Sequence, residues 1–265
     1  PLSKWLTRGE PQNNKSQALW ISSRLATRVR KACLSASLPL KRIDLHLHGL
    51  LLQLRRHLLG LEEADVGIFF LRFLQLKDSQ LAHITEFIES EKAVVGLRTS
   101  THAFHYPAGH PRSALNNDFG QKVLGSPYLI HLAGKTQVKP AANALHHPIL
   151  SGVETTGWES SGTLYLINAQ SGIEPLLIGT GKSKRVGTVT NQFGVHELQK
   201  TMSAPIAWTW KNSYGSRVFT TSLGHEKDFT NPSAVRVIIN GVFWSVNQPV
   251  PPPKTVIHTR AIQLK

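Results

Sequence analysis

The sequence is poor in cysteine, methionine and acidic residues: it has one Cys, one Met and 16 Asp and Glu in 265 residues. A single thiol, Cys33, excludes an internal disulfide and an all-cysteine metal site. The long apolar stretches, such as VGIFFL at 66–71, fall far short of the roughly 20 residues that a membrane-spanning helix needs. These absences exclude a disulfide-stabilised scaffold and a membrane span, and a 40% apolar composition is typical of a globular protein.

The start of the printed sequence also lacks a charged segment followed by an apolar one, so no signal peptide is visible after Pro1. Together with the single cysteine, this favours a soluble protein of the cytoplasm over a secreted one. Export stays open for a chain whose signal peptide has been removed.

Positive charge is abundant but unevenly distributed. The net charge is +14, and residues 1–60 hold 11 Lys and Arg against Glu10 and Asp44, whereas the rest holds 19 against 14. A basic surface is typical of phosphate binding, but residues 61–265 carry no aromatic and basic nucleic-acid motif. Nucleic acid is therefore disfavoured as a partner. Residues 1–61 are predicted to be a separate basic segment, either an amphipathic helix for an acidic partner or membrane surface, or an ordinary helix with a solvated basic face.

The remaining sequence alternates between short apolar runs and helical patterns. Runs bounded by Gly, Pro or polar clusters predict strands at 66–71, 93–97, 163–167, 174–179, 205–210 and 217–223. Apolar residues at helical spacing predict a helix over 78–92, with Asp78 or Ser79 capping its start. A strand, a helix and a second strand in this order form a βαβ unit, which belongs to a parallel sheet.

A second helix is predicted over 231–247, because Asn231 suits the N-cap and Pro232 the first helical position. Its apolar residues should pack across the sheet. We therefore expect an α/β domain over 62–248, a three-layer sandwich with a mostly parallel central sheet. Residues 249–265 contain three consecutive prolines and are predicted to be a tail.

Two polar segments directly follow predicted strands. GLRTSTHAFHYPAGH, residues 96–110, follows one, and SLGH, ending at His225, follows another. Ligands of parallel α/β sheets collect at the carboxyl ends of the strands. The two segments are therefore predicted to meet at one edge of the sheet and to form a ligand site.

Several blocks between residues 62 and 246 resemble the ThuA-like (trehalose utilisation) family, whose fold is similar to that of class I glutamine amidotransferases and flavodoxin. These blocks are EADVGIFFLRF, AVVGLRTSTHAFHYPAGHP, DFGQKVLGSPY, HHPILSGVE, PIAWTWKNSYGSRVFTTSLGHEKDF and NPSAVRVIINGVFW. The resemblance implies a protein of carbohydrate metabolism.

The resemblance also identifies the catalytic positions. The amidotransferase relatives place a cysteine in a Gly-X-Cys turn, where this sequence has Gly96, Leu97 and Arg98, so thiol-dependent glutaminase chemistry is excluded. His225 matches their catalytic histidine, but Lys227 stands where they have a glutamate, which leaves Glu226 or Asp228 as its partner.

The predicted site residues fall into three roles. Arg98 is a donor for a carboxylate, a phosphate or vicinal hydroxyls, and His102 and His225 are candidates for general acid and base. The predicted ligand-binding residues are Thr99, Ser100, Thr101, His105, His110, Tyr128 and Trp210. No cofactor is required, but a divalent metal such as Zn²⁺ stays an alternative, with His102, His105, His110, His131 and His225 as weak candidate ligands.

Two functions remain open at this point. The first is an enzyme, or degenerate enzyme, acting on trehalose or a similar glycoside by hydrolase-type or isomerase-type chemistry. The second is a non-catalytic module of the same fold that binds a ligand or a protein. The partner in the first case is a small sugar-like molecule, and a homo-oligomer is compatible with either.

Overall fold

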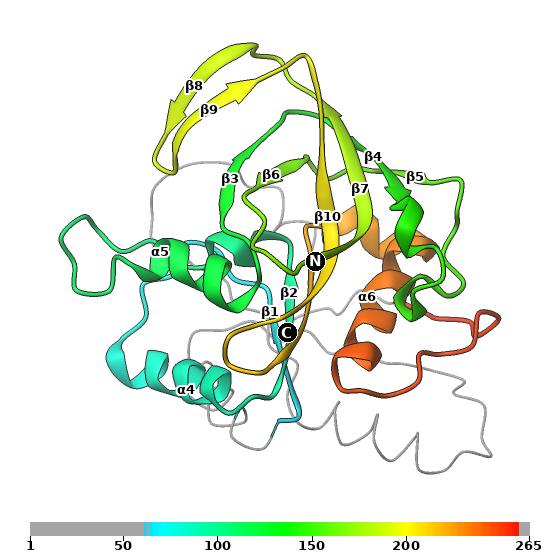
Figure 1. Cartoon of the computed structure of the whole chain (residues 1–265), viewed down its shortest axis with the longest axis horizontal. Helices are drawn as coiled ribbons and strands as arrows, with labels where there is room; N and C mark the ends of the chain where they lie inside the picture. Colours follow the sequence, from blue (N-terminus) through cyan, green and yellow to red (C-terminus); the bar gives the residue numbers. More distant parts are fainter. Residues whose placement is uncertain (1–60, 62–63, 260–265) are drawn as a thin grey trace, which may run out of the picture.

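The structure is a computed structural model that describes Leu61 and residues 64–259. The predictions for residues 1–60, including Cys33, lie outside the described residues. A curled seven-stranded sheet crosses the described chain (Figure 1). Its strands, in spatial order, are β1 (Val66–Phe69), β2 (Ala93–Leu97), β11 (Arg217–Thr221), β10 (Thr201–Lys211), β7 (Glu174–Lys182), β4 (Thr136–Pro140) and β5 (Trp158–Ser160).

The sheet is mixed, so the prediction of a mostly parallel sheet is wrong. β1, β2 and β11 form two parallel pairs, whereas the four pairs from β11 to β5 are antiparallel. For the β10–β11 pair, the reason is the length of the connection. Only residues 212–216 join β10 to β11, and a parallel pair needs a crossover of a dozen or more residues.

The first βαβ unit is confirmed. β1 pairs in parallel with β2, from Val66 opposite Ala93 onward, and α4 (Asp78–Glu89) connects them. The N-cap is Lys77 rather than Asp78 or Ser79. Asp78 is instead the first helical residue, where a negative charge interacts favourably with the helix dipole.

The second predicted helix is also confirmed as α6 (Pro232–Ser245). The Asn231 side chain accepts a hydrogen bond from the Ala234 backbone N–H at 3.0 Å, as an N-cap should. Gly241 lies so close to Phe219 of β11 that a Cβ on it would be 2.2 Å from the ring. A glycine is thus required where α6 meets the sheet.

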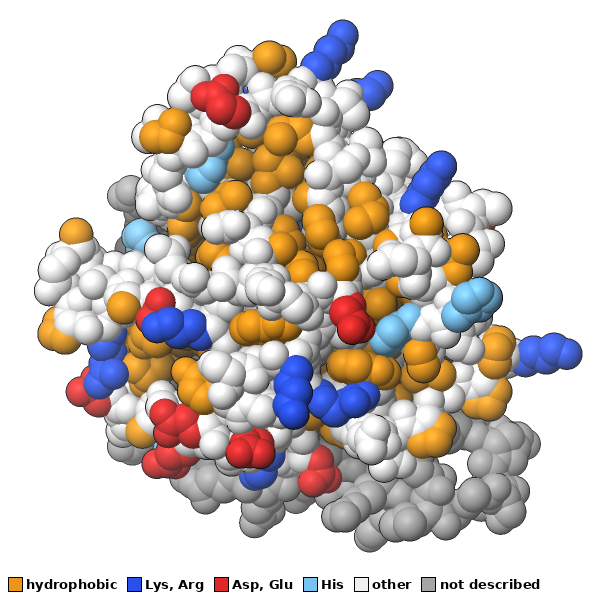
Figure 2. Space-filling model, viewed as in Figure 1, with side chains coloured by type: hydrophobic (Ala, Val, Ile, Leu, Met, Phe, Trp, Pro, Cys, Tyr) orange, Lys and Arg blue, Asp and Glu red, His pale blue; other side chains and the backbone are white. Residues whose placement is uncertain are grey.

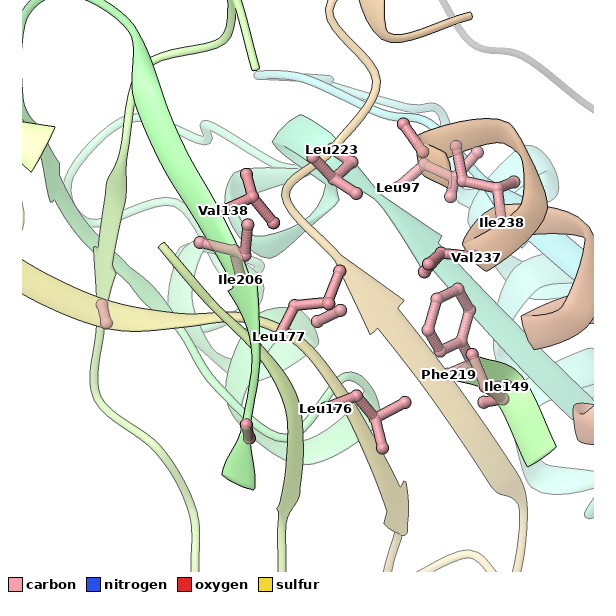
Figure 3. Close-up of a cluster of buried hydrophobic side chains, with 14 of the residues drawn as sticks. Leu97, Val138, Ile149, Leu176, Leu177, Ile206, Phe219, Leu223, Val237 and Ile238 are labelled. Carbon is pink, nitrogen blue, oxygen red and sulfur yellow. The ribbon is translucent and has the colours of Figure 1, made fainter. Parts of the chain in front are cut away.

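Two apolar cores cover the two faces of the parallel half of the sheet. Alternate strand residues, such as Leu97 and Phe219, point to one face and pack against Val237 and Ile238 of α6 (Figure 3). The residues between them, such as Val94, point to the other face and pack with α4. This alternation gives three layers in the parallel half, because successive strand residues point to opposite sides.

Two small antiparallel sheets and several short helices complete the described chain. β3 (Tyr128–His131) pairs with β6 (Tyr165–Ile167), and β8 (Gly187–Asn191) forms a hairpin with β9 (Gly194–Leu198). The short helices are η2 (Arg98–His102), α5 (Leu115–Asp118), η3 (Phe119–Val123), η4 (Ala142–Ala144), η5 (Pro148–Leu150) and η6 (Glu226–Thr230). Figure 2 shows apolar side chains in the middle of one face, and charged side chains mostly around its edges and its lower part.

The predicted tail has no helix or strand in its described part, residues 249–259. Val250 and Ile257 pack against the side of α6 that carries Val235 and Ile239. Within the described residues, no helix is long and apolar enough to cross a membrane.

Candidate functional site

The first turn of the site joins β2 to η2 and carries Arg98. We call residues 97–102 the Arg98 turn. Arg98 has a φ of +46°, in the left-handed region, which costs a non-glycine residue on the order of 1–3 kcal/mol. The Ser100 hydroxyl holds the turn in place, because its oxygen accepts from Leu71 N at 3.0 Å and lies 2.7 Å from the Phe69 carbonyl oxygen, to which it donates. Ser100 is therefore engaged with the backbone rather than open to a ligand.

The second turn joins β11 to η6 and carries His225. We call residues 222–226 the His225 turn. Asp228 is 2% exposed, and its Oδ2 accepts from the backbone N–H groups of Gly224 and His225, both at 2.9 Å. Its Oδ1 accepts from the Ser160 hydroxyl at 2.7 Å. Asp228 therefore shapes the turn and ties it to β5.

The His225 ring is oriented by the backbone rather than by a carboxylate. Its Nδ1 accepts from Lys227 N at 3.3 Å, so the neutral ring carries its proton on Nε2. Burial and the charge of Arg98 lower the pKa of His225, against the opposing effect of Asp228 and Glu226. The ring is thus a neutral donor near pH 7, and the predicted partnership with Glu226 or Asp228 is replaced by a backbone contact.

The Arg98 turn and the His225 turn lie side by side, as the sequence predicted. A Cβ on Gly162, in the loop between β5 and β6, would lie 2.7 Å from Arg98 Nη1 and 3.5 Å from His225 Cβ. A Cβ on Gly224 would lie 3.3 Å from Arg98 Cβ. Both turns therefore contact one another and the same glycine loop at the carboxyl ends of β2 and β11.

His102 ends the Arg98 turn inside a group of aromatic rings, which we call the aromatic box. Its members and their centroid distances to the His102 ring are Tyr128 at 4.3 Å, Phe73 at 5.1 Å, Tyr165 at 5.6 Å and Phe193 at 6.4 Å. Phe193 comes from the tip of the β8–β9 hairpin, which lies beside β3 (Figure 1). The Asn191 side chain fixes this hairpin by donating to the Leu129 carbonyl at 2.9 Å.

Burial makes His102 neutral. It lowers the pKa of His102 to about 3, with further contributions from the positive charges of Arg72, His131 and Arg98. Burial likewise raises the pKa of Tyr128, and the Tyr128 hydroxyl lies 2.6 Å from His131 Nδ1. A base with a pKa of about 3 is weak at neutral pH, so His102 suits hydrogen bonding better than proton transfer.

Three buried polar atoms of the Arg98 turn have no hydrogen-bond partner within the described residues. They are Arg98 Nη1, Thr101 Oγ1 and His102 Nδ1. Leaving a buried donor or acceptor unpaired costs about 1–3 kcal/mol. Thr99, also buried, follows Arg98 in the same turn. Such a group of unpaired atoms is expected where a ligand completes the hydrogen bonding.

Other predicted residues lie apart from this site. Trp210 lies opposite Val218, which itself lies opposite Val94, near the start of β2. β10 runs antiparallel to β11, so its end reaches the opposite edge of the sheet from Arg98. Trp210 there donates to the Ser171 carbonyl at 3.1 Å.

The predicted histidine cluster comes together only in part. His110 is exposed and stacks on Tyr106 at 4.8 Å, whereas His105 lies beside Phe73 and His131 beside Tyr128, both members of the aromatic box. Among Leu61 and residues 64–259, no three His, Cys, Asp or Glu side chains are placed to hold a metal ion. The geometry of the described chain therefore gives no support to the metal alternative.

The structure adds residues that sequence reasoning missed. Three further segments reach the site, and they contribute Arg72, Phe193, and Gly162 together with Tyr165. The sequence contains one signal for them, since Arg72 directly follows the buried end of a strand run. Phe193 and Gly162 reach the site only through long-range packing.

Comparison with known proteins gives the family. The sequence model of the ThuA (trehalose utilisation) family matches residues 59–245, well over half of the 265 residues. The chain belongs to the ThuA family. This match includes both turns and the aromatic box of the ThuA domain. A search of the curated proteins gives no match.

Solved structures that resemble this chain in part share little sequence with it. A ThuA-like protein from Bacteroides uniformis is 14% identical, with 74% of this chain and 75% of that chain covered at a TM-score of 0.49. One from Parabacteroides merdae is 11% identical, with 73% and 77% covered at 0.47. A cytoplasmic protein from Salmonella typhimurium is 10% identical, with 71% and 74% covered at 0.45.

Proposed function

We propose that this ThuA domain is an enzyme of carbohydrate utilisation that binds a sugar-derived ligand between the Arg98 turn and the His225 turn. The observation that carries the proposal is the contact of both turns with Gly162 at one edge of the sheet. The sugar class comes from the family, trehalose utilisation. The fold is proposed to be that of the class I glutamine amidotransferases, with Arg98 in place of their cysteine.

The geometry supports distinct roles for three side chains. Arg98 binds the ligand through guanidinium N–H groups. His225 donates its Nε2 proton to a ligand oxygen, since Nδ1 already accepts from Lys227 N. His102 offers the unpaired Nδ1 as a further hydrogen-bonding atom. Polarisation of a ligand carbonyl or hydroxyl by these hydrogen-bond donors is the chemistry that these groups favour.

Hydrolysis by a pair of carboxylates is less well supported. Glycosidases of that kind use two Asp or Glu side chains that flank the bond. Here both Asp228 oxygens already accept hydrogen bonds from Ser160, Gly224 and His225. Asp228 is therefore committed to the turn, and isomerase-type chemistry is favoured over this form of hydrolysis.

The test separates binding from turnover. The full chain is titrated with trehalose and with oxidised trehalose by calorimetry, and product formation is followed by chromatography. We expect His225→Ala to lower kcat by about 10²–10³ while the Kd changes less than about threefold, because removal of one donor to an oxygen that gains charge in the transition state has that magnitude. Arg112→Gln is the control, since Arg112 pairs with Asp78 at the surface.

The second candidate is a non-catalytic binding module of the same fold. The half-buried guanidinium at the Arg98 turn, where relatives carry a nucleophile, and the weak basicity of His102 favour it. Tight binding without any turnover in the wild type would establish this module. Absence of both binding and turnover for these sugars contradicts the enzyme and the sugar-binding module alike.

A further inference from the structure

We propose that the ligand of this site carries an oxyanion, a carboxylate or a phosphate, and that the Arg98 guanidinium binds it. The location of this group rests on the proposed function, that is, on a ligand between the two turns. The chemical class of the ligand is argued independently, from how the protein treats its buried guanidinium groups and from the charges around the site.

Two other arginines with partly buried guanidinium groups are satisfied internally by backbone carbonyl oxygens. Arg217 donates to the Trp244 carbonyl at 2.9 and 3.2 Å and stacks on the Trp244 ring at 3.9 Å. Arg236 donates to the carbonyl oxygens of Pro252 and Thr255. The protein thus pairs these guanidinium groups with its own backbone oxygens, as burial of a charge demands.

Arg98 is treated differently. Its Nη1 is buried without a hydrogen-bond partner among the described residues, which also contain no ion pair to it. Its neighbours are the Tyr165 ring, 5.6 Å from the guanidinium carbon, and the backbone of Gly162. Neither offers an anion, and an unpaired buried donor is costly. An oxyanion from outside would supply the missing acceptor, and a guanidinium binds carboxylate and phosphate with two parallel hydrogen bonds.

The charges around Arg98 point to the same class of ligand. The positive charges of Arg72 and Arg98 lower the pKa of both His102 and His131. The charge of Arg185 also lowers the pKa of His131. All the charges that shift these two histidines are positive. The carboxylates of Asp228 and Glu226 act instead on His225, at the other turn of the site. The aromatic-box side of the site therefore has a positive field, which attracts an anionic ligand.

The backbone of the Arg98 turn gives a third, separate argument. The chain holds Arg98 at a φ of +46°, where glycine would be less strained. A long charged side chain in this position is directed by the turn toward His225 and Gly162. The unpaired Thr101 Oγ1 and His102 Nδ1 on the same turn are neutral groups suited to the hydroxyls of the rest of the ligand.

The experiment compares charged and neutral sugars on the full chain. Glucose, glucose 6-phosphate and glucuronate are titrated by calorimetry at 50 mM salt, with inorganic phosphate as a fourth probe. We expect one charged sugar to bind at least about tenfold more tightly than glucose. The phosphate and the carboxylate arms then tell which oxyanion is preferred, and 500 mM salt should weaken the preference.

Variants connect the preference to Arg98. Arg98→Gln should remove the difference between charged and neutral sugars, and Arg98→Lys should retain part of it, because lysine keeps the charge but not the fork. Arg112→Gln, at the surface, should leave the preference unchanged. Circular dichroism and thermal melting show whether each variant is folded.

The outcomes separate this inference from the proposed function. If glucose binds as tightly as both charged sugars, the sugar site stands and the oxyanion inference falls. If inorganic phosphate binds but no sugar does, the anion site stands and the proposed sugar function falls. If none of the four probes binds, both are overturned.

Discussion

The parallel and antiparallel halves of the large sheet contribute different things to the site. The parallel half, β1, β2 and β11, supplies the Arg98 turn and the His225 turn at the ends of its strands. The antiparallel half and the segments around it supply Ser160, Gly162 and the ring of Tyr165. The comparison teaches that the chemical groups come from one half, whereas part of their burial comes from the other half and the segments around it.

The largest expected effect follows from breaking the link between the halves at Asp228. Asp228→Ala removes an acceptor shared by Ser160, Gly224 and His225. We expect a loss of about 3 kcal/mol in the free energy of unfolding, because hydrogen bonds to a buried charged group are worth about 1.5–3 kcal/mol each. Urea denaturation at pH 7 measures it.

Asp118→Asn is the matched control, since Asp118 makes an i,i+4 ion pair with Lys122 on the surface. Such a pair contributes about 0.3–0.5 kcal/mol. Equal costs for the two substitutions would show that Asp228 does not join the two halves.

The second prediction concerns the neutral His102 that the aromatic box buries. The unfolded chain protonates this histidine near pH 6.5, but the folded protein only near pH 3. Stability is therefore lost as the pH falls from about 6.5 toward 3, by up to about 1.4 kcal/mol per pH unit. In His102→Phe, the loss in the free energy of unfolding between pH 6.5 and 5 should be smaller by about 2 kcal/mol, measured by urea denaturation at each pH.

The free energy of unfolding is compared between pH values within each variant. The cost of repacking the aromatic box is the same at each pH and therefore cancels. If His102→Phe and the wild type lose stability in parallel as the pH falls, burial of His102 by the aromatic box is not what keeps its ring neutral.

The smallest effect is expected at Gly162, where only the placement of Arg98 should change. The added Cβ of Gly162→Ala would lie 2.7 Å from Nη1, the end of a flexible side chain, which can move by a few tenths of an ångström. We expect the free energy of unfolding to change by less than about 1 kcal/mol. Ligand binding should weaken by about tenfold, because small misplacements of a binding group are costly.

Gly172→Ala serves as a comparison, since an added Cβ there would make only an ordinary contact, 3.8 Å from Trp210 Nε1, at the opposite edge of the sheet. It has a φ of +81°, so it should lower stability without weakening ligand binding. If Gly162→Ala leaves the Kd unchanged, the loop does not position Arg98.

The sequence predicts the groups that directly follow a strand better than those that depend on strand direction. Arg98 and His225 each come directly after an apolar run, so their meeting at one edge follows from two parallel strands. Trp210 also ends a run, but β10 is antiparallel and carries it to the other edge. Only five residues lie between 211 and 217, which is too few for a parallel crossover, so the sequence could have predicted that β10 and β11 form a hairpin.

The enclosure of the site could not be predicted in the same way. Phe193 lies at a hairpin tip in a polar sequence, and only the packing of β9 beside β3 brings it to His102. Gly162 matters through a close approach to Arg98 that no local pattern reports. These contacts depend on long-range packing, whereas the strands and α6 follow from local periodicity and capping.

The left-handed conformation at position 98 has a consequence for protein engineering. The bend there is fixed by the Ser100 hydroxyl and the neighbouring strand, neither of which depends on the guanidinium. A different functional group grafted onto this one position would be displayed in the same direction on an unaltered scaffold. A single codon change can therefore replace the functional group at this position, while the backbone of the turn that presents it stays the same.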